Sequence, residues 1–221
     1  MKLLLIDTSN QPLSVAITNN NETIAEINNN SKVNHSVQLM PEIQRLFEQS
    51  GISKHDLDGI VVAEGPGSYT GLRIGVTTAK TLAYALNCKL YGVSSLKSLA
   101  ACIKEDYRLL VPIFDARREA VYTGIYQRQS DGTLETILED QYISIEDLKS
   151  KLHEFNQKYL FIGQDTSKLS HLLEGECIDQ LPQASVMSEL ISQPADIHSF
   201  VPKYHKITEA ERNWINQQKN S

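Results

Sequence analysis

The residues of this chain with the clearest chemical potential lie in the segment EGPGSYTGLRIG, at positions 64–75. Its glycines permit backbone angles that a side chain would forbid, and Ser68 or Thr70 can cap a following helix. Free amides at the start of a helix favour anions, so Gly65, Gly67, Ser68 and Thr70 could contact a phosphate. However, the segment has neither the Gly-Lys-Ser/Thr ending of a Walker A loop nor the GxGxxG spacing of dinucleotide-binding proteins. We therefore favour a turn that sets the direction of the helix over a phosphate cradle by roughly 2 to 1.

Two aspartates, Asp7 and Asp115, each end an apolar run that has the composition of a buried strand. Such an aspartate can hold Mg²⁺ beside a phosphate, or it can accept hydrogen bonds from the amides of a turn. For Asp7 we favour the turn. For Asp115 we favour an ion-pair cluster with the charged residues that follow it, which are Arg117, Arg118 and Glu119.

The histidines show no catalytic or metal-binding pattern. His35 lies at the predicted start of a helix. At such a position we expect an imidazole that is hydrogen bonded nearby or faces a partner, rather than one that acts as a general base. The other five share no ligand spacing, and they are His55, His153, His171, His198 and His205. Neither a Ser-His-Asp constellation nor an HExxH motif can be read from the sequence, which argues against a peptidase. We assign no catalytic, cofactor-binding or metal-binding residue.

Composition predicts a folded cytoplasmic protein. The chain has 221 residues, of which 41% are hydrophobic, and a formal net charge of −6. The apolar content is ample for a core, and the acidic balance opposes polyanions unless basic residues cluster locally. Three cysteines without CxxC spacing indicate a reducing compartment rather than a disulfide framework. The first apolar run is too short for a signal peptide and no segment could span a bilayer, so we expect no contact with a membrane.

The elements that must position these residues follow from hydrophobic periodicity. In the first half we predict strands at 3–6, 13–17, 23–27, 60–63 and 89–91, with helices at 36–49, 72–86 and 96–103. Pro41 should kink the first helix or mark its true start. In the second half we predict strands at 109–114, 121–126, 134–142 and 159–162 and a helix at 145–155. Residues 180–193 read as irregular.

The order of elements indicates a duplication. Asp7 and Asp115 occupy matching places, and their separation of 115 − 7 = 108 residues is close to half of the chain. We predict an α/β protein with tandem βββαβα, ribonuclease-H-like halves. This is the arrangement of the actin, Hsp70 and hexokinase class of ATPases, which hold a nucleotide between two related lobes. We expect a first lobe at 1–104 that carries partner-binding helices and a second, truncated lobe at 105–221 with a C-terminal tail.

Four stretches of the sequence resemble the bacterial TsaB family, the dimerisation subunit of the machinery that makes threonylcarbamoyladenosine in tRNA. They are LIDTS at 5–9, NHS at 34–36, EGPGSYTGLRIG at 64–75, and FDARR at 114–118 running into Val121-Tyr122. Pro202-Lys203-Tyr204 and Ala210-Glu211 add support near the end of the chain. The resemblance covers almost the whole length.

The resemblance implies a non-catalytic relative of TsaD, the enzyme that transfers a threonylcarbamoyl group to the adenosine beside the anticodon. TsaD-like enzymes carry an HxxxH metal pair on a helix after a Gly-Val strand end. In the matching register this chain has Ser95 and Leu99, and neither side chain can replace an imidazole on a transition metal. The enzymes also need a late glycine-rich turn for adenine, whereas the segment FIGQD at 161–165 has one glycine. We therefore expect neither metal nor cofactor.

Small residues recur at every fourth position of the second predicted helix and form a stripe that would let another helix come close. The first predicted helix adds apolar side chains, and two helices per subunit could form a four-helix bundle with a related molecule. The alternative, that both stripes pack on their own sheet, has about even odds for each face. The predicted partner interface comprises His35, Val37, Met40, Phe47, Gly71, Leu72, Gly75, Val76, Ala79 and Ala83.

We therefore predict a scaffold that dimerises with a TsaD-type catalytic subunit, helps to recruit a small TsaE-type ATPase, pairs with itself when alone, and meets tRNA only through the complex. One alternative, motivated by the aspartates and the glycine loop, is an ATP-dependent transferase or small-molecule kinase that is active on its own. A third hypothesis, direct tRNA binding, would need a local patch that includes Lys97, Lys104 and Arg108.

Overall fold

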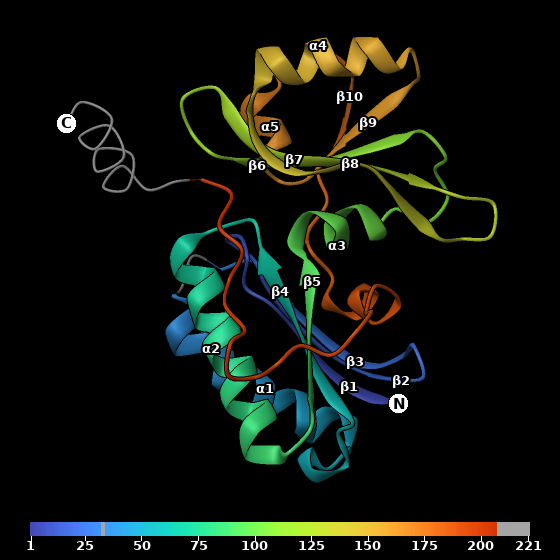
Figure 1. Cartoon of the computed structure of the whole chain (residues 1–221). Helices are drawn as coiled ribbons and strands as arrows, with labels where there is room; N and C mark the ends of the chain where they lie inside the picture. Colours follow the sequence, from blue (N-terminus) through green and yellow to red (C-terminus); the bar gives the residue numbers. More distant parts are fainter. Residues whose placement is uncertain (32–33, 207–221) are drawn as a thin grey trace.

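The computed structural model describes residues 1–31 and 34–206, which fold around two five-stranded sheets stacked end to end (Figure 1). Ala210 and Glu211, which contribute to the resemblance, lie outside the described residues. The first sheet has the order β3-β2-β1-β4-β5 and the second the order β10-β9-β6-β7-β8. Reversed, the second order matches the first strand for strand, so the predicted duplication and the ribonuclease-H-like class are confirmed. Within the described part of the chain, none of the helices has the length and apolar character that crossing a membrane requires.

The first sheet is built from five strands and three helices. Its strands are β1 (Lys2–Asp7), β2 (Leu13–Asn19), β3 (Glu22–Asn29), β4 (Gly59–Gly65) and β5 (Lys89–Ser94). The first three strands are antiparallel, and β1, β4 and β5 are parallel, which requires the helical crossovers between them. The helices are α1 (His35–Ser50), α2 (Tyr69–Leu86) and α3 (Ser95–Ala101), and a short 3₁₀ turn, η1 (Lys54–Asp56), precedes β4.

The second sheet repeats this plan with shorter elements. It contains β6 (Leu109–Asp115), β7 (Ala120–Arg128), β8 (Leu134–Ser144), α4 (Ile145–Phe155), β9 (Tyr159–Ile162), α5 (Thr166–Leu169) and β10 (Glu176–Ile178). The predicted truncation therefore lies in the crossover helix, since α5 has 4 residues where α2 has 18, and not in the number of strands. The 3₁₀ helix η2 (Ala184–Glu189) follows, in the segment that the sequence predicts to be irregular.

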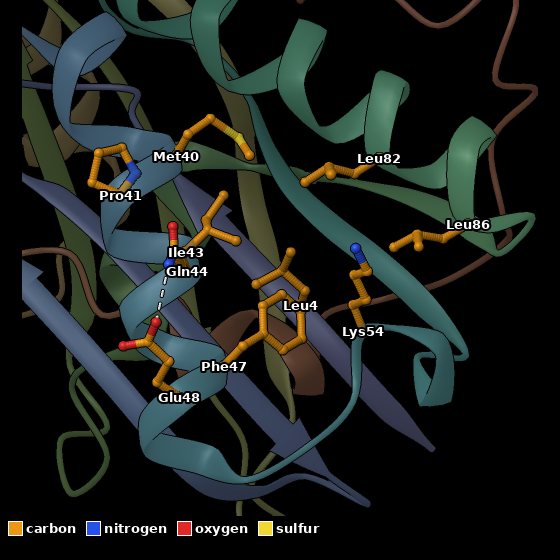
Figure 2. A pocket seen from close by; sticks show the side chains of 10 residues that line it. All are labelled: Leu4, Met40, Pro41, Ile43, Gln44, Phe47, Glu48, Lys54, Leu82 and Leu86. Carbon is orange, nitrogen blue, oxygen red and sulfur yellow. Dashed lines mark hydrogen bonds between the residues drawn. The ribbon is translucent and has the colours of Figure 1, made fainter.

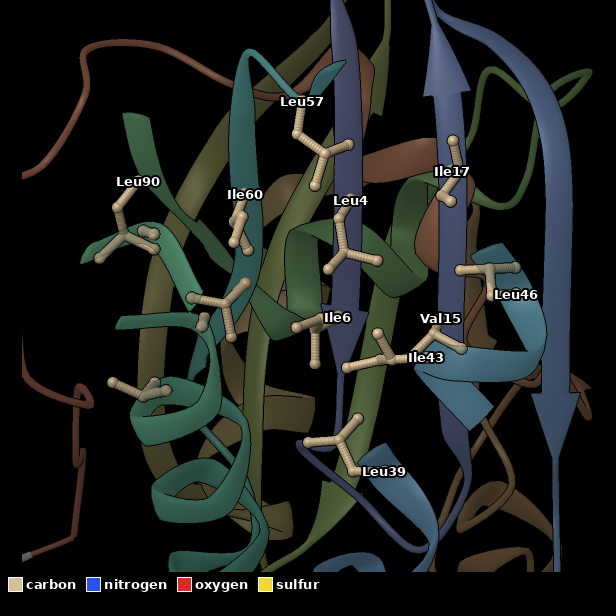
Figure 3. Close-up of a cluster of buried hydrophobic side chains, with 14 of the residues drawn as sticks. Leu4, Ile6, Val15, Ile17, Leu39, Ile43, Leu46, Leu57, Ile60 and Leu90 are labelled. Carbon is tan, nitrogen blue, oxygen red and sulfur yellow. The ribbon is translucent and has the colours of Figure 1, made fainter. Parts of the chain in front are cut away.

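One face of the first sheet packs against α1 and α2 (Figure 3). The helices contribute buried side chains to a core that includes Leu4 and Ile6 of the central strand. Asn34 caps α1, because its side chain accepts the Ser36 amide, and Gly51 ends the helix with a φ of 65°. Pro41 lies inside α1, so the predicted alternative that it marks the start of the helix is wrong.

Helix α3 connects the two sheets, although it precedes the second half in sequence. Its residues Leu96, Leu99 and Ala100 are buried against Leu110 and Leu160 of the second sheet. Figure 1 shows α3 between the sheets and α4 on the far face of the second one. The opposite face of the first sheet is covered by η2 instead of a helix of the first half.

The segment after β10 returns along the first sheet, and we call residues 190–206 the strap. It runs past α2 to the junction of the two sheets (Figure 1). Its backbone pairs with β5 through Ala195 and Leu90, and the Lys203 amide donates to the Glu64 carbonyl at 2.7 Å. The Lys203 ammonium also lies 2.7 Å from the carboxylate of Glu64. The division into lobes at residues 104 and 105 stays a prediction, and this strap belongs by contact to the first sheet.

A polar cluster joins the end of β5 to the second sheet. The Ser94 hydroxyl donates to Asp140 Oδ2 at 2.5 Å and accepts the Lys97 amide at 2.9 Å, so one side chain caps α3 and contacts β8. The Tyr126 hydroxyl donates to Asp140 Oδ1. Burial raises the pKa of Asp140, and the hydrogen bonds from Ser94 and Tyr126 lower it in part. The two donors thus offset part of the free-energy cost of placing the Asp140 carboxylate at this partly buried position.

We expect Tyr126→Phe to lower the free energy of unfolding at pH 7 by about 1–3 kcal/mol, because it removes a donor from a half-buried carboxylate. Loss of the donor raises the pKa of Asp140 in the folded protein further above its ordinary value of 3.8. A carboxyl group with a raised pKa in the folded state lowers the free energy of unfolding as the pH rises above that ordinary value. The loss should therefore shrink as pH falls toward 4, which urea denaturation at several pH values measures. Tyr122→Phe is the matched control, since the Tyr122 hydroxyl has no hydrogen bond to any described residue, and an equal loss in both variants contradicts the assignment.

Candidate functional site

The glycine loop packs on the turn that follows β1. A Cβ atom on Gly67 would lie 2.1 Å from the Ser9 carbonyl oxygen, and one on Gly71 would lie 2.1 Å from that of Thr8. The contact is hydrogen bonded, since the Ser68 amide donates to the Ser9 carbonyl at 2.6 Å and the Thr8 hydroxyl to the Gly71 carbonyl at 2.8 Å. The glycines therefore permit close approach of the chain to itself, as the turn interpretation predicts.

Gly65, at the end of β4, has a different neighbour. A Cβ atom there would lie 2.3 Å from the Lys203 carbonyl oxygen, and its φ of 129° favours glycine. The strap therefore fits over this end of the loop. Ser68 caps α2 by accepting the Gly71 amide at 3.3 Å, which leaves Thr70 within the first turn of the helix. Contact of these loop residues with an anion stays a prediction.

Both aspartates accept hydrogen bonds within their own turns. Asp7 is 2% exposed, and its Oδ1 accepts the Ser9 amide at 2.8 Å. Burial raises the pKa of Asp7, while the Ser9 hydrogen bonds and the nearby His35 lower it in part. Asp115 is exposed, and its Oδ1 accepts the Arg117 amide at 2.7 Å. Asp115 thus lies in a turn similar to that of Asp7, and its ion-pair cluster with the charged residues that follow stays a prediction.

The chain after Asp115 is unusual, because three residues in succession have a left-handed backbone. The φ angles of Arg117, Arg118 and Glu119 are 65°, 55° and 54°. This conformation is costly for residues with a side chain. Two backbone hydrogen bonds hold it, from the Ala116 amide to the Ala120 carbonyl at 2.9 Å and from the Ala120 amide to the Arg117 carbonyl at 3.2 Å. Arg117 lines a cavity of about 450 Å³ together with Gly67, Ser68 and Thr70 of the glycine loop.

Metal and purine sites of the enzyme class find little support in the described residues. No group of three or more His, Cys, Asp and Glu side chains is placed to hold a metal ion within them. Ser95 and Leu99, at the positions of the enzyme's ligands, are both buried. His35 Nε2 lies 3.0 Å from the Gln11 carbonyl oxygen. At the late turn, a Cβ atom on Gly163 would meet the Ile113 carbonyl oxygen at 2.9 Å and a methyl of Leu99 at 3.1 Å, so packing occupies this turn.

The small-residue stripe of α2 faces the protein's own sheet. A Cβ atom on Gly75 would lie 2.3 Å from the Thr8 hydroxyl oxygen, and Ala79 and Ala83 belong to the first core. The idea that this stripe receives a partner helix is therefore corrected, because no surface remains there for a second protein. The predicted interface residues that are buried in this way are Gly71, Leu72, Gly75, Val76, Ala79 and Ala83.

The other predicted interface residues lie on α1. Met40 and Phe47 line an apolar groove between α1 and α2 (Figure 2), whereas His35 and Val37 are not part of its lining. Val37 is 66% exposed, Met40 is 50% exposed, and Phe47 and His35 are half-buried. The groove has a volume of about 650 Å³. It is lined by Leu4, Met40, Pro41, Ile43, Gln44, Phe47, Glu48, Lys54, Leu82 and Leu86. The apolar groove residues on α1 can be predicted from their helical spacing. Leu86 and Lys54 are distant from α1 in the sequence, and only the fold brings them to the same groove.

The basic residues considered for direct tRNA binding are largely engaged. Lys104 lies 2.8 Å from Glu189, and Arg108 forms ion pairs of 2.7 Å with both Asp106 and Glu176. The Lys97 ammonium donates to the Thr136 hydroxyl at 3.2 Å. Acidic neighbours therefore balance the charges of Lys104 and Arg108, whereas the Lys97 ammonium has a neutral hydroxyl as its partner.

Comparisons with known proteins agree on one family. The model of the family described as TsaD, tRNA N6-adenosine threonylcarbamoyltransferase, matches residues 22–214. The tRNA threonylcarbamoyladenosine biosynthesis protein TsaB of Bacillus subtilis is 42% identical over an alignment of 230 residues, which covers 99% of this chain and 100% of that protein. The TsaB protein of Escherichia coli is 29% identical over 203 residues, or 87% of each chain.

A solved structure, YeaZ from Pseudomonas aeruginosa, has a TM-score of 0.78 to this chain. It is 22% identical and covers 92% of this chain and 99% of its own. A second structure is described as an uncharacterized protein from Pseudomonas aeruginosa with similarity to peptidase YeaZ, with the same TM-score of 0.78 and 22% identity, over 93% of this chain and 99% of its own. At this identity the likeness shows the fold.

We expect Gly71→Ala to lower the free energy of unfolding by about 1–3 kcal/mol, because the new methyl group would overlap the Thr8 carbonyl. Helix propensity alone predicts the opposite, a gain of about 1 kcal/mol. Thr77→Ala, at an exposed position of the same helix, is the control and should stay within about 0.5 kcal/mol of the wild type. Denaturant unfolding without any ligand measures the free energy of unfolding of both variants. A Gly71→Ala protein as stable as the wild type would contradict the idea that the close contact with Thr8 excludes a side chain at position 71.

Proposed function

Because the chain belongs to the TsaB family of tRNA threonylcarbamoyladenosine biosynthesis proteins, we propose that it is a non-catalytic subunit that dimerises with a TsaD-type enzyme. In this role it supports transfer of a threonylcarbamoyl group to the adenosine next to the anticodon. The docking surface is the groove between α1 and α2. The observation that carries the proposal is the exposure of Met40 in its lining, with exposed Val37 three residues earlier on α1.

The chemistry of the groove supports a protein helix as its occupant. Its floor and walls are aliphatic, aromatic and thioether side chains, and its rim carries Gln44, Glu48 and Lys54. An apolar centre with a polar rim is typical of protein interfaces, and methionine adapts to different partners. A subunit of related fold would have a corresponding pair of helices, with which α1 and α2 could complete a four-helix bundle.

The opposite side of α2 is covered by the strap. Lys80 donates to the carbonyls of His198 and Phe200, at 3.1 and 2.7 Å. Leu82 lines the groove and follows Lys80 by two residues, which is about 200° around a helix. The strap thus leaves the groove side of α2 free, which supports the groove as the side that meets a partner.

The same surface can serve two states of the subunit. A second copy of the chain would occupy the groove in the absence of enzyme, and the enzyme would replace it. We place recruitment of a small TsaE-type ATPase and contact with tRNA at the level of the assembled complex, because Lys104 and Arg108 are already paired with acidic side chains. Micromolar binding of ATP with Mg²⁺ to the isolated chain, about −8 kcal/mol by calorimetry, would instead support an enzyme active on its own.

We expect Val37→Glu and Met40→Glu each to weaken pairing with the TsaD-type subunit at least tenfold. Met40→Glu places a charge in the lining of the apolar groove, and Val37→Glu places one on the exposed apolar side chain three residues earlier on α1. Val201→Glu is the matched control, since Val201 on the strap is 65% exposed against 66% for Val37. Co-purification and analytical gel filtration measure pairing, and thermal denaturation confirms that all variants fold. Equal loss in the control, or full pairing in both α1 variants, contradicts the groove as the docking surface.

A further inference from the structure

The side of α2 that faces the strap combines aromatic rings with positive charge. Tyr69, Arg73, Lys80 and Tyr84 lie within about 60° of one another around the helix axis, and we call these four residues the aromatic-basic line. The line is about 22 Å long, since each of its 15 helical steps adds about 1.5 Å. Residues 69–86 contain no aspartate or glutamate. Helix α2 is therefore a basic element in a chain whose formal net charge is −6.

The two cations of the line have neutral partners. Arg73 Nε donates to the Tyr204 hydroxyl at 3.1 Å, and the guanidinium carbon lies 4.2 Å from the centre of the Tyr69 ring. The Lys80 ammonium donates to two backbone carbonyls of the strap, at 3.1 and 2.7 Å. Neither cation forms an ion pair with any residue that the structure describes. Both positive charges therefore stay uncompensated and attract an anion.

The tyrosines around these cations are exposed, although each has a neighbour on the strap or on α2. Tyr69 and Tyr204 stack with 4.9 Å between their ring centroids, and Tyr84 meets His198 edge-on at 5.9 Å. Tyr69, Tyr84 and Tyr204 still have exposed fractions of 48%, 69% and 43%. The contacts thus fix the orientation of the rings and leave much of their surface open to solvent.

Exposed rings beside uncompensated cations have the chemistry that recognises single-stranded RNA. Every unpaired base has a π face that stacks on tyrosine, and the phosphates between bases bind lysine and arginine. A duplex keeps its bases stacked on one another, so it would use the cations and not the rings. An acidic protein segment would do the same. The choice of RNA over DNA rests on the role in tRNA modification that is proposed above.

We propose that the aromatic-basic line and Tyr204 bind a single-stranded segment of RNA. Tyr84 and Tyr204 stack on bases at the two ends of the surface, and Arg73 and Lys80 bind phosphates between them. The apolar groove lies on the other side of α2, since Leu82 of its lining is about 200° around the helix from Lys80. RNA can therefore bind this chain while a protein partner occupies the groove.

Fluorescence anisotropy of a labelled 12-nucleotide oligouridylate, titrated with the full chain at several salt concentrations, tests the proposal. We expect binding whose logarithmic affinity falls with the logarithm of the salt concentration with a slope of roughly −1.4. Each cation that neutralises a phosphate of a single strand contributes about −0.7 to this slope. A duplex RNA of the same length should bind at least fivefold more weakly, because its bases are not available for stacking.

Charge and stacking are separated by different variants. Arg73→Gln and Lys80→Gln should each lower the affinity at least threefold and make the salt slope shallower by about 0.7. Tyr84→Ala should lower the affinity at least threefold with an unchanged slope, because it removes a stacking face and no charge. Tyr84→Phe should bind as the wild type does. A residue that only fastened the strap would not change the slope by one charge.

Two controls lie outside the surface. Lys97→Gln removes a cation whose partner is also neutral, the Thr136 hydroxyl, and Tyr107→Ala removes a tyrosine that is 63% exposed. Both should bind RNA as the wild type does, and thermal denaturation confirms that all variants fold.

Any of four results overturns the proposal: no binding of the single strand at low salt, equal affinity for the duplex, equal losses in the two controls, or displacement of the RNA by polyglutamate at an equal concentration of charge. Failure of this inference is distinguishable from failure of the proposed pairing. Arg73→Gln should retain pairing with the TsaD-type subunit, and Met40→Glu should retain the affinity for RNA.

Discussion

The close approach of α2 to the turn after β1 determines most of what this molecule can do. Backbone oxygens of Thr8 and Ser9 occupy the space where side chains would stand on Gly71 and Gly67. Any larger residue would push the helix away from the central strand. The position of α2 in turn sets one wall of the apolar groove, through Leu82 and Leu86, and one wall of the inter-sheet cavity, through Ser68 and Thr70. The shapes of the groove and of the cavity therefore both depend on one contact between backbones.

The two sheets are held together by contacts that differ in kind. Helix α3 buries apolar side chains on the second sheet, and the Ser94 hydroxyl donates to Asp140 across the junction. The strap contacts both halves, since its Lys203 pairs with Glu64 of β4 and its Lys206 donates to the Ala116 carbonyl after β6. Relatives of this fold class that use a nucleotide hold it between their lobes. Here the strap contacts the start of the glycine loop, where the Lys203 carbonyl oxygen lies 2.3 Å from the position of a Cβ atom on Gly65.

Sequence patterns predicted the elements of the first half to within a few residues, because strand alternation, the Ser68 cap and the Gly51 stop are local signals. The duplication was predictable for the same reason, from two matching aspartates. β10 and η2 were not predictable, since three-residue strands and 3₁₀ turns carry too little periodicity. The strap is held by contacts such as Lys203 with Glu64, which join residues far apart in the chain.

The small-residue stripe shows where residue patterns stop being informative. Glycine and alanine at every fourth position of α2 indicate that something approaches closely, but the pattern is the same whether that neighbour is a second protein or the helix's own sheet. The central strand β1 has Leu4 and Ile6 on this face of the sheet, and these side chains must be buried. The small-residue stripe of α2 packs on them, so it is not available to a partner. The apolar side chains that remain exposed are instead those of Val37 and Met40 on α1. A partner surface on a helix is therefore better sought in the large apolar residues beside such a stripe than in the stripe itself.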